Sequence, residues 1–305
     1  MDFSLLTLGT ASALPTANRY PSAHILTVRG RLFLIDCGES AQMQIRKARV
    51  SLAKIDNIFI SHLHGDHVFG LFGLLSTFAM AGRMTPLYIY APAGLARILD
   101  FFKDEFGEGV KYDIVLNPVN CTAPVQIYEN RTMEILAFPL RHREQTYGYL
   151  FREKQPRRNI VKEAVGKYNL SLSEIARLKE GLDIEKVSAA EVTYVPYVPR
   201  SFAYCSDTAP FKALPSWVKG VDLLYHEATF TEEYRELAKK TFHSTAADAA
   251  RCALAAGAKR LVLGHYSSRF KSLTPVLQEA RAIFKESCLA KEGSIFDIPL
   301  LKYKL

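Results

Sequence analysis

Short apolar runs rich in β-branched and aromatic residues recur along the first half of the chain, and Gly, Pro or Asp separates them. Runs of this kind are typical of buried β-strands. Longer segments with apolar residues at helical spacing alternate with these runs. Such alternation predicts a layered α/β fold. The predicted strands are residues 5–8, 24–28, 32–35, 58–60, 87–90 and 133–140, and the predicted helices are residues 70–80 and 94–102.

The pattern changes between about residues 153 and 195, where basic residues arrive without a predicted strand. Two helix-like pieces follow, and one of them begins with Ser171 and Glu174, the spacing of a capping box. We therefore expect an inserted arm within a single domain that spans residues 1–305. After the arm the alternation resumes, with strands predicted at residues 202–205, 222–225 and 260–263 and helices at residues 246–256 and 275–285.

The composition is that of an ordinary globular protein, because 49% of the 305 residues are hydrophobic and 23% are charged. No run of about 18 apolar residues is present, so we expect no membrane span. The start of the chain has an apolar run but no Lys or Arg before Arg19, which favours a first strand over a secretion signal. Five widely spaced cysteines without a CxxC pair predict free thiols and a cytoplasmic location.

The segment that follows the strand at residues 58–60 is rich in metal-ligand residue types. His62, His64, Asp66 and His67 lie within six positions, just before the predicted helix. Imidazoles and carboxylates are the ligands that first-row divalent ions select. The alternating His62 and His64 send both rings to one side of an extended backbone, and Gly65 allows a turn toward a second position. Four such residues so close together suit two metal ions better than one.

Three other predicted strands also end in residues that can bind metal. His142, Asp207 and His265 are each separated by one residue from the end of an apolar run. In open α/β sheets, sites gather beyond the carboxyl ends of the strands, so we expect these three side chains on the same rim as the histidine-rich loop. Asp207 is the best candidate for a carboxylate that bridges two ions.

Two further clusters fall on a similar rim. His226 and Glu227 follow the predicted strand at residues 222–225, and His243 stands just before a helix that Ser244 or Thr245 can cap. A histidine beside a glutamate can be held as an imidazolium, which donates a proton to a leaving oxyanion or braces a phosphate.

These residues carry a resemblance to a known family. The whole chain resembles the metallo-β-lactamase superfamily and, within it, the ribonuclease Z family of tRNA 3′-processing endonucleases. The hexapeptide at residues 62–67 alone is shared with glyoxalase II, phosphodiesterases and sulfatases, so narrower motifs are needed. They are LGT at 8–10, PT at 15–16 with Arg19 and Ser22, HEAT at 226–229, HST at 243–245 and HYSSRF at 265–270.

The resemblance implies a four-layer αββα sandwich with an inserted basic arm, and it implies two zinc ions per chain. His62, His64 and His142 would bind one ion, and Asp66, His67 and His265 the other, with Asp207 as the bridge. Asp66 would also orient or deprotonate the attacking water, Glu227 and His243 would form the proton-donating pair, and Arg269 would hold phosphate near the tRNA 3′ end. The residue types themselves would also accept manganese or iron.

Most of the excess positive charge of the chain, which has a formal net charge of +8, lies between residues 141 and 167, a stretch that includes the start of the arm. Between residues 141 and 167 there are eight basic and three acidic residues. We expect Arg157, Arg158, Lys162 and Lys167 to contact the substrate backbone. The family usually has a Gly- and Pro-rich arm tip, whereas the corresponding residues 166–170 contain no proline.

The sequence therefore predicts a zinc-dependent endoribonuclease that removes the 3′ trailer from precursor tRNA. It would leave a 3′-hydroxyl on the tRNA and a 5′-phosphate on the trailer, and the resemblance adds a homodimer. A small-molecule phosphodiesterase and a glyoxalase II-like hydrolase share the same two-metal centre and remain alternatives, although neither has a reason for a basic arm. A nucleic-acid-binding protein without catalysis is a third reading, against which the complete ligand set argues.

Overall fold

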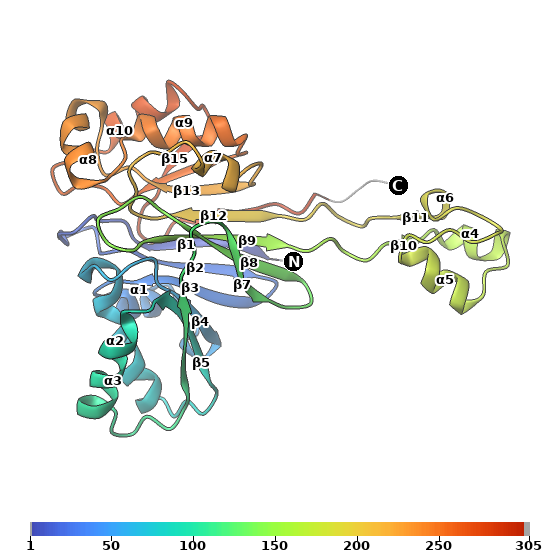
Figure 1. Cartoon of the computed structure of the whole chain (residues 1–305), viewed down its shortest axis with the longest axis horizontal. Coiled ribbons are helices and arrows are strands. Elements are labelled where there is room, and N and C mark those ends of the chain that lie inside the picture. Colours follow the sequence, from blue (N-terminus) through green and yellow to red (C-terminus); the bar gives the residue numbers. More distant parts are fainter. Residues whose placement is uncertain (1, 302–305) are drawn as a thin grey trace.

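A computed structural model describes residues 2–301 of the chain. Two seven-stranded sheets form its centre (Figure 1). In the first sheet the strand order is β16 (Ile295–Asp297), β1 (Phe3–Gly9), β2 (Ala23–Val28), β3 (Arg31–Cys37), β4 (Ile55–Phe59), β5 (Leu87–Pro92) and β6 (Ile114–Val119). In the second it is β15 (Ser287–Leu289), β14 (Leu261–Gly264), β13 (Leu223–Glu227), β12 (Ser201–Cys205), β9 (Tyr147–Glu153), β8 (Met133–Pro139) and β7 (Val125–Glu129).

Helices cover the outer face of each sheet, so the layers follow the order αββα (Figure 1). The predicted four-layer α/β sandwich is thus confirmed. The helices on the first sheet are α1 (Ala41–Lys47), α2 (Gly65–Met80) and α3 (Leu95–Phe106), and a 3-10 turn lies at Leu52–Lys54. Those beside the second sheet are α7 (Leu214–Trp217), α8 (Arg235–Thr241), α9 (Ala246–Ala256) and α10 (Thr274–Arg281), with a 3-10 turn at Glu232–Tyr234.

Three apolar cores hold the layers together. The first lies between the two sheets and is rich in aromatic residues, among them Phe33, Phe59, Phe151 and Tyr204. The second joins the first sheet to α1–α3, and the third joins the second sheet to α7, α9 and α10. Because both faces of the central strands are buried, the strands are continuously apolar, and polar residues appear where the strands end.

The parallel strands place their carboxyl ends at a common edge. In the second sheet β12, β13 and β14 are parallel to one another, and β8 runs in the same direction because it pairs with β9, which is antiparallel to both β8 and β12. In the first sheet β3, β4 and β5 are parallel. The loops after β4, β8, β12 and β14 carry five of the seven predicted metal ligands, and the start of α2 carries the other two.

The segment between β9 and β12 projects away from the sheets as an arm (Figure 1). It contains its own two-stranded sheet, β10 (Asn159–Ile160) with β11 (Thr193–Tyr194), which the sequence analysis missed. Its helices are α4 (Lys162–Lys167), α5 (Leu172–Lys179) and α6 (Ala189–Val192), and α5 begins with the predicted Ser171–Glu174 capping box. Six apolar side chains form a small core in the arm: Ala164, Leu170, Leu178, Val187, Ala189 and Val192.

A group of charged side chains joins the base of the arm to the sheets, and we call it the arm clamp. Its centre is Glu153, the last residue of β9, whose side chain is fully buried. Glu153 Oε1 lies 2.7 Å from Arg29 Nε in the β2–β3 turn and 2.9 Å from Arg200 Nη2, just before β12. Arg200 also donates to the carbonyl of Ile298 at 3.0 Å. Two arginines therefore compensate the buried carboxylate.

None of the helices within residues 2–301 is both long enough and apolar enough to cross a membrane.

Candidate metal centre

The predicted ligands come from five separate places in the fold and converge at the common strand edge. His62 and His64 follow β4, His142 lies between β8 and β9, Asp207 follows β12 and His265 follows β14. The sequence analysis expected Asp66 and His67 ahead of a helix, but both lie in the first turn of α2, which begins at Gly65. The polar ligands interrupt the helical spacing of apolar residues, so the sequence pattern predicted the start of the helix at residue 70 and not at residue 65.

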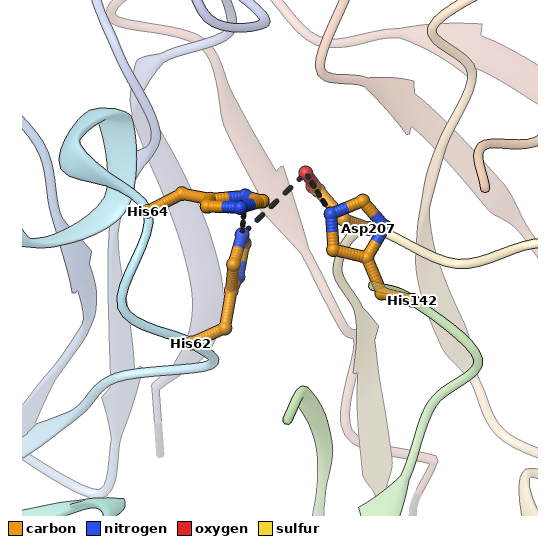
Figure 2. Close-up of side chains that lie close together, drawn as sticks. All are labelled: His62, His64, His142 and Asp207. Atoms are coloured by element: carbon orange, nitrogen blue, oxygen red, sulfur yellow. Dashed lines mark hydrogen bonds and ion pairs between the residues drawn. The ribbon is translucent and has the colours of Figure 1, made fainter. Parts of the chain in front are cut away.

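The first ligand cluster consists of His62, His64, His142 and Asp207, each of which offers one atom within 4.8 Å of the others. His62 Nε2 lies 3.0 Å from His64 Nδ1, and Asp207 Oδ2 lies 3.6 Å from His62 Nε2 and 3.9 Å from His142 Nε2 (Figure 2). The four side chains point toward one another from opposite sides of the edge.

His142 provides the test of whether this cluster suits a metal ion. Its Nδ1 lies 3.0 Å from the carbonyl oxygen of Phe242, so this nitrogen carries the proton. Its Nε2 is buried and has no hydrogen-bond partner. An unprotonated, buried nitrogen that faces a carboxylate and two other imidazoles fits a divalent cation. The donor set thus supports divalent metal binding at this edge.

The second ligand cluster consists of Asp66, His67 and His265, whose offered atoms also lie within 4.8 Å of one another. The Nε2 atoms of His67 and His265 are 3.3 Å apart, and Asp66 Oδ2 lies 3.4 Å from His265 Nε2. Asp207 Oδ1 lies 3.5 Å from His67 Nε2 and 3.2 Å from His265 Nε2. One oxygen of Asp207 therefore faces each cluster, which is the geometry of a bridging carboxylate.

Other polar side chains hold the ligand rings in place, and Asp36 is the most connected. This fully buried residue at the end of β3 accepts a hydrogen bond from His67 Nδ1 at 2.7 Å. On the opposite side Thr229 Oγ1 lies 2.9 Å from His265 Nδ1. Such contacts fix the ring orientation and the tautomer of a ligand histidine. The sequence analysis missed Asp36, although an acidic residue between a continuous apolar strand and Gly38 was a usable signal.

The charge state of the ligands differs between the clusters. Burial lowers the pKa of His62 well below its ordinary value, and the neighbouring rings of His67 and His64 lower it further. Burial also opposes the protonation of His67, but the charges of Asp66, Asp207 and Asp36 outweigh it and raise the pKa of His67 well above the ordinary value. A cation in the second cluster must therefore displace a proton from His67, which makes metal binding pH-dependent.

Glu227 and His243 form a buried acid–base pair beside the two clusters. Glu227 Oε1 lies 2.8 Å from His243 Nδ1, and the carboxylate also accepts backbone N–H groups of Thr208 and Thr229 at 3.0 Å each. Burial raises the pKa of Glu227, but His243 and these bonds outweigh it and bring the pKa to about 2. Burial lowers the pKa of His243, yet Glu227 overcomes this effect and raises it to about 9. At neutral pH the pair is carboxylate and imidazolium.

His243 also lies within reach of the ligand clusters, because Asp207, His243 and His265 offer atoms within 4.8 Å of one another. The sequence analysis expected His226 and Glu227 to follow a strand, but they are the last two residues of β13. Successive side chains in a strand point to opposite faces. His226 therefore lies away from the clusters and lines a surface pocket with Asp248 and Cys252, while Glu227 faces His243.

Comparison with known proteins identifies the family. The chain is 42% identical over 296 residues to ribonuclease Z of Bacteroides fragilis, a match that covers 95% of this chain and 97% of the relative. It is 40% identical over 301 residues to ribonuclease Z of Porphyromonas gingivalis, a match that covers 97% of this chain and 99% of the relative. The chain belongs to the ribonuclease Z family. The resemblance inferred from the motifs is confirmed.

Solved structures and family models agree with membership of the ribonuclease Z family. The crystal structure of human tRNase Z, short form, superimposes with a TM-score of 0.72 at 26% identity and covers 97% of this chain and 99% of that one. The metallo-β-lactamase fold protein YhfI from Bacillus subtilis shares the fold, with a TM-score of 0.70 at 18% identity, 97% of this chain and 100% of that one. Family models described as "Beta-lactamase superfamily domain" and "Anti-Pycsar protein Apyc1" match residues 191–266 and 3–101.

The predicted substrate-binding residues of this ribonuclease Z family chain lie outside the ligand clusters. Arg269 is exposed in the loop after β14. Arg157, Lys162 and Lys167 are exposed on the arm, whereas Arg158 is partly buried and donates Nε–H to Thr193 Oγ1 at 2.6 Å. The structure thus brings the seven predicted ligands together with Glu227 and His243, and it leaves the basic residues on separate surfaces.

Proposed function

We propose that this chain is a metal-dependent endoribonuclease that removes the 3′ trailer from precursor tRNA, leaving a 3′-hydroxyl on the tRNA and a 5′-phosphate on the trailer. The observation that carries the proposal is Asp207, because its two carboxylate oxygens face two separate ligand clusters. Relatives named ribonuclease Z that match nearly the whole chain at about 40% identity support the substrate class.

The proposed cofactor is two zinc ions per chain. His62, His64 and His142 would hold the first, Asp66, His67 and His265 would hold the second, and Asp207 would serve both. When bound, two such ions lower the pKa of a water molecule and stabilise the charge that develops on the attacking and leaving oxygens.

The proposed roles of the other side chains follow from their contacts. Asp66 orients the attacking water, since its carboxylate lies at the edge of the second cluster beside His265. Water attacks the phosphorus, and the bond between phosphorus and the ribose 3′-oxygen of the tRNA breaks. The His243 imidazolium donates its proton to this leaving oxygen, and Glu227 stabilises the positive charge of His243 before the transfer.

The basic surfaces account for the choice of a large substrate. We propose that Arg269 binds phosphate near the tRNA 3′ end and that Arg157, Arg158, Lys162 and Lys167 bind the backbone through the arm. Phosphate contacts of this kind position the nucleic acid and make its affinity depend on salt. We further propose a homodimer and a cytoplasmic location; sedimentation of the purified chain and fractionation of cells test these two points.

One assay tests the function directly. Precursor tRNA with a 3′ trailer is incubated with the chain, and both product ends are mapped. We expect one cut at the trailer junction, with a 3′-hydroxyl and a 5′-phosphate. A chain that hydrolyses a small chromogenic phosphodiester but leaves the precursor intact would be a small-molecule phosphodiesterase, and the proposal would be wrong.

The metal content is tested separately. Elemental analysis of the purified chain should find two zinc ions per chain, and Asp207→Ala should lower the content of both sites because each cluster loses an oxygen ligand. At most one ion per chain, with no further uptake on titration, would contradict the two-metal centre.

A further inference from the structure

An exposed aromatic side chain stands at the edge of the metal centre without a role in it. Phe69 lies in the first two turns of α2, and 68% of its surface is exposed. Residues three and four positions apart lie on the same face of a helix. Phe69 therefore shares a face with Asp66 and Gly65, whereas Val68 and Leu71 point into the core.

Gly65 shows where the ring of Phe69 lies. A Cβ atom placed on Gly65 would come within 2.3 Å of Cε2 and 2.6 Å of Cζ of Phe69. The ring thus lies against the backbone of Gly65, the residue between His64 and Asp66, and a side chain at position 65 would force the ring to move. One part of the ring is covered by this backbone, and most of the remainder is open to solvent.

A second exposed apolar side chain lies near the same carboxylate. Leu14 is 65% exposed, and its neighbour Ala13 donates its backbone N–H to Asp66 Oδ2 at 2.8 Å. Apolar side chains are thus exposed to solvent both on α2 and in the loop after β1 that contacts Asp66.

We propose that Phe69 is a stacking platform for the nucleobase of a nucleotide that flanks the scissile phosphate. The inference rests on the proposed function, because only an RNA substrate places a nucleobase there. Unpaired bases of RNA stack on exposed aromatic rings, and such stacking tolerates any sequence because each base has a π-face. This property suits an enzyme whose substrates share a cleavage position but differ in the adjacent bases.

The experiment compares removal of the Phe69 ring by mutation with removal of the nucleobase from the substrate. We expect Phe69→Ala to lower kcat/KM for precursor tRNA by about 5- to 150-fold, the range for the loss of one stacked base, mainly through KM. Phe69→Tyr keeps the ring and should cleave as the unmodified chain does, whereas Phe69→Leu should resemble the alanine variant. The matched control is Phe101→Ala, because Phe101 is 59% exposed on α3, which carries no ligand.

The decisive measurement uses precursors with an abasic nucleotide on one or the other side of the scissile phosphate. With one of these substrates, kcat/KM of the unmodified chain should fall as much as Phe69→Ala lowers it with the normal precursor. Assaying Phe69→Ala with that same substrate should lower kcat/KM little further, since both changes remove the same contact. Fully additive losses, or a Phe69→Tyr variant as poor as Phe69→Ala, would overturn the stacking role.

Two further readouts separate this result from other failures. Zinc content and the sedimentation coefficient of Phe69→Ala should match those of the unmodified chain; a changed assembly state would assign the ring to subunit contact and overturn the inference. If the unmodified chain does not cleave precursor tRNA, the proposed function itself is wrong. If it does and Phe69→Ala is equally active on every substrate, only the stacking inference is wrong.

Discussion

Replacement of Asp36 by asparagine should weaken metal binding although Asp36 is not a ligand. Its Oδ2 accepts hydrogen bonds from His67 Nδ1 at 2.7 Å, Tyr204 Oη at 2.6 Å and Ser61 Oγ at 2.9 Å, and its Oδ1 accepts the backbone N–H of Ser61 at 2.7 Å. The side chain is fully buried, so water cannot replace a missing acceptor. The carboxylate thus connects a ligand of the second cluster to both sheets.

The size of the effect follows from these four contacts. An asparagine has one acceptor oxygen in place of two. In its better orientation the oxygen takes the place of Oδ2 and the NH2 group faces only the backbone N–H of Ser61. In its worse orientation the NH2 group faces the other three donors. One unpaired buried donor costs about 1–3 kcal/mol of the free energy of unfolding. Loss of the carboxylate behind a ligand histidine typically lowers metal affinity by about 10–100-fold. We therefore expect Asp36→Asn to fold with reduced stability and to bind a divalent cation at the second ligand cluster about 10–100-fold more weakly.

The assay is a titration of metal-free protein with zinc in competition with a chromogenic chelator, accompanied by thermal unfolding. Asp56→Asn is the matched control, because Asp56 is half-exposed, pairs with Arg83 and contacts no ligand. Unchanged affinity of Asp36→Asn for both ions, with a loss of stability no larger than that of the control, would refute the reasoning.

Three further results are expected. His243→Ala should lower kcat by about 10²–10⁴-fold while precursor binding changes little, because the proton donor is lost; normal turnover with weak binding would make His243 a phosphate contact. Deletion of residues 155–185 should weaken precursor binding and flatten its salt dependence, while hydrolysis of a small phosphodiester persists; loss of both activities would mean that the arm is required for folding. Burial raises the pKa of Glu153, but Arg200 and Arg29 outweigh this effect and leave the pKa lowered. The ionised Glu153 therefore stabilises the fold above the ordinary carboxyl pKa, and this contribution is lost as the pH falls through the lowered pKa. Glu153→Gln should make thermal stability less sensitive to acid, and an unchanged dependence of thermal stability on pH would contradict this role of Glu153.

The ligand set could be predicted from the sequence because the ligands lie within a few residues of the ends of apolar strands, or in the first turn of the helix that follows β4. His142, Asp207 and His265 are far apart in the chain, and only the common direction of β8, β12 and β14 brings them together. That direction is a regular property of layered α/β sheets. The metal centre was therefore the most predictable part of the molecule.

Elements with weaker patterns were missed for identifiable reasons. β6 and β7 are edge strands of the two sheets, and all but one of their residues are exposed or only partly buried. Asn117 and Pro118 interrupt the apolar residues of β6, and Gln126 interrupts those of β7, so neither strand has a long apolar run. β10 and β11 have two residues each, which is too short to show any alternation. Asp36 was missed because an acidic residue before a glycine is common in turns. Its role depends on His67 in α2 and on Tyr204 in the second sheet, and only the folded structure brings these residues next to it.

The arm clamp makes the arm behave as a lever. Because the arm is attached at its base, a small rotation at Glu153 displaces the helices at the far end of the arm more than it displaces the sheets. The support draws on both sheets, because Arg29 lies in a hairpin of the first and Glu153 ends a strand of the second. The base of the arm is therefore held to both sheets at the strand ends opposite the edge that carries the metal ligands.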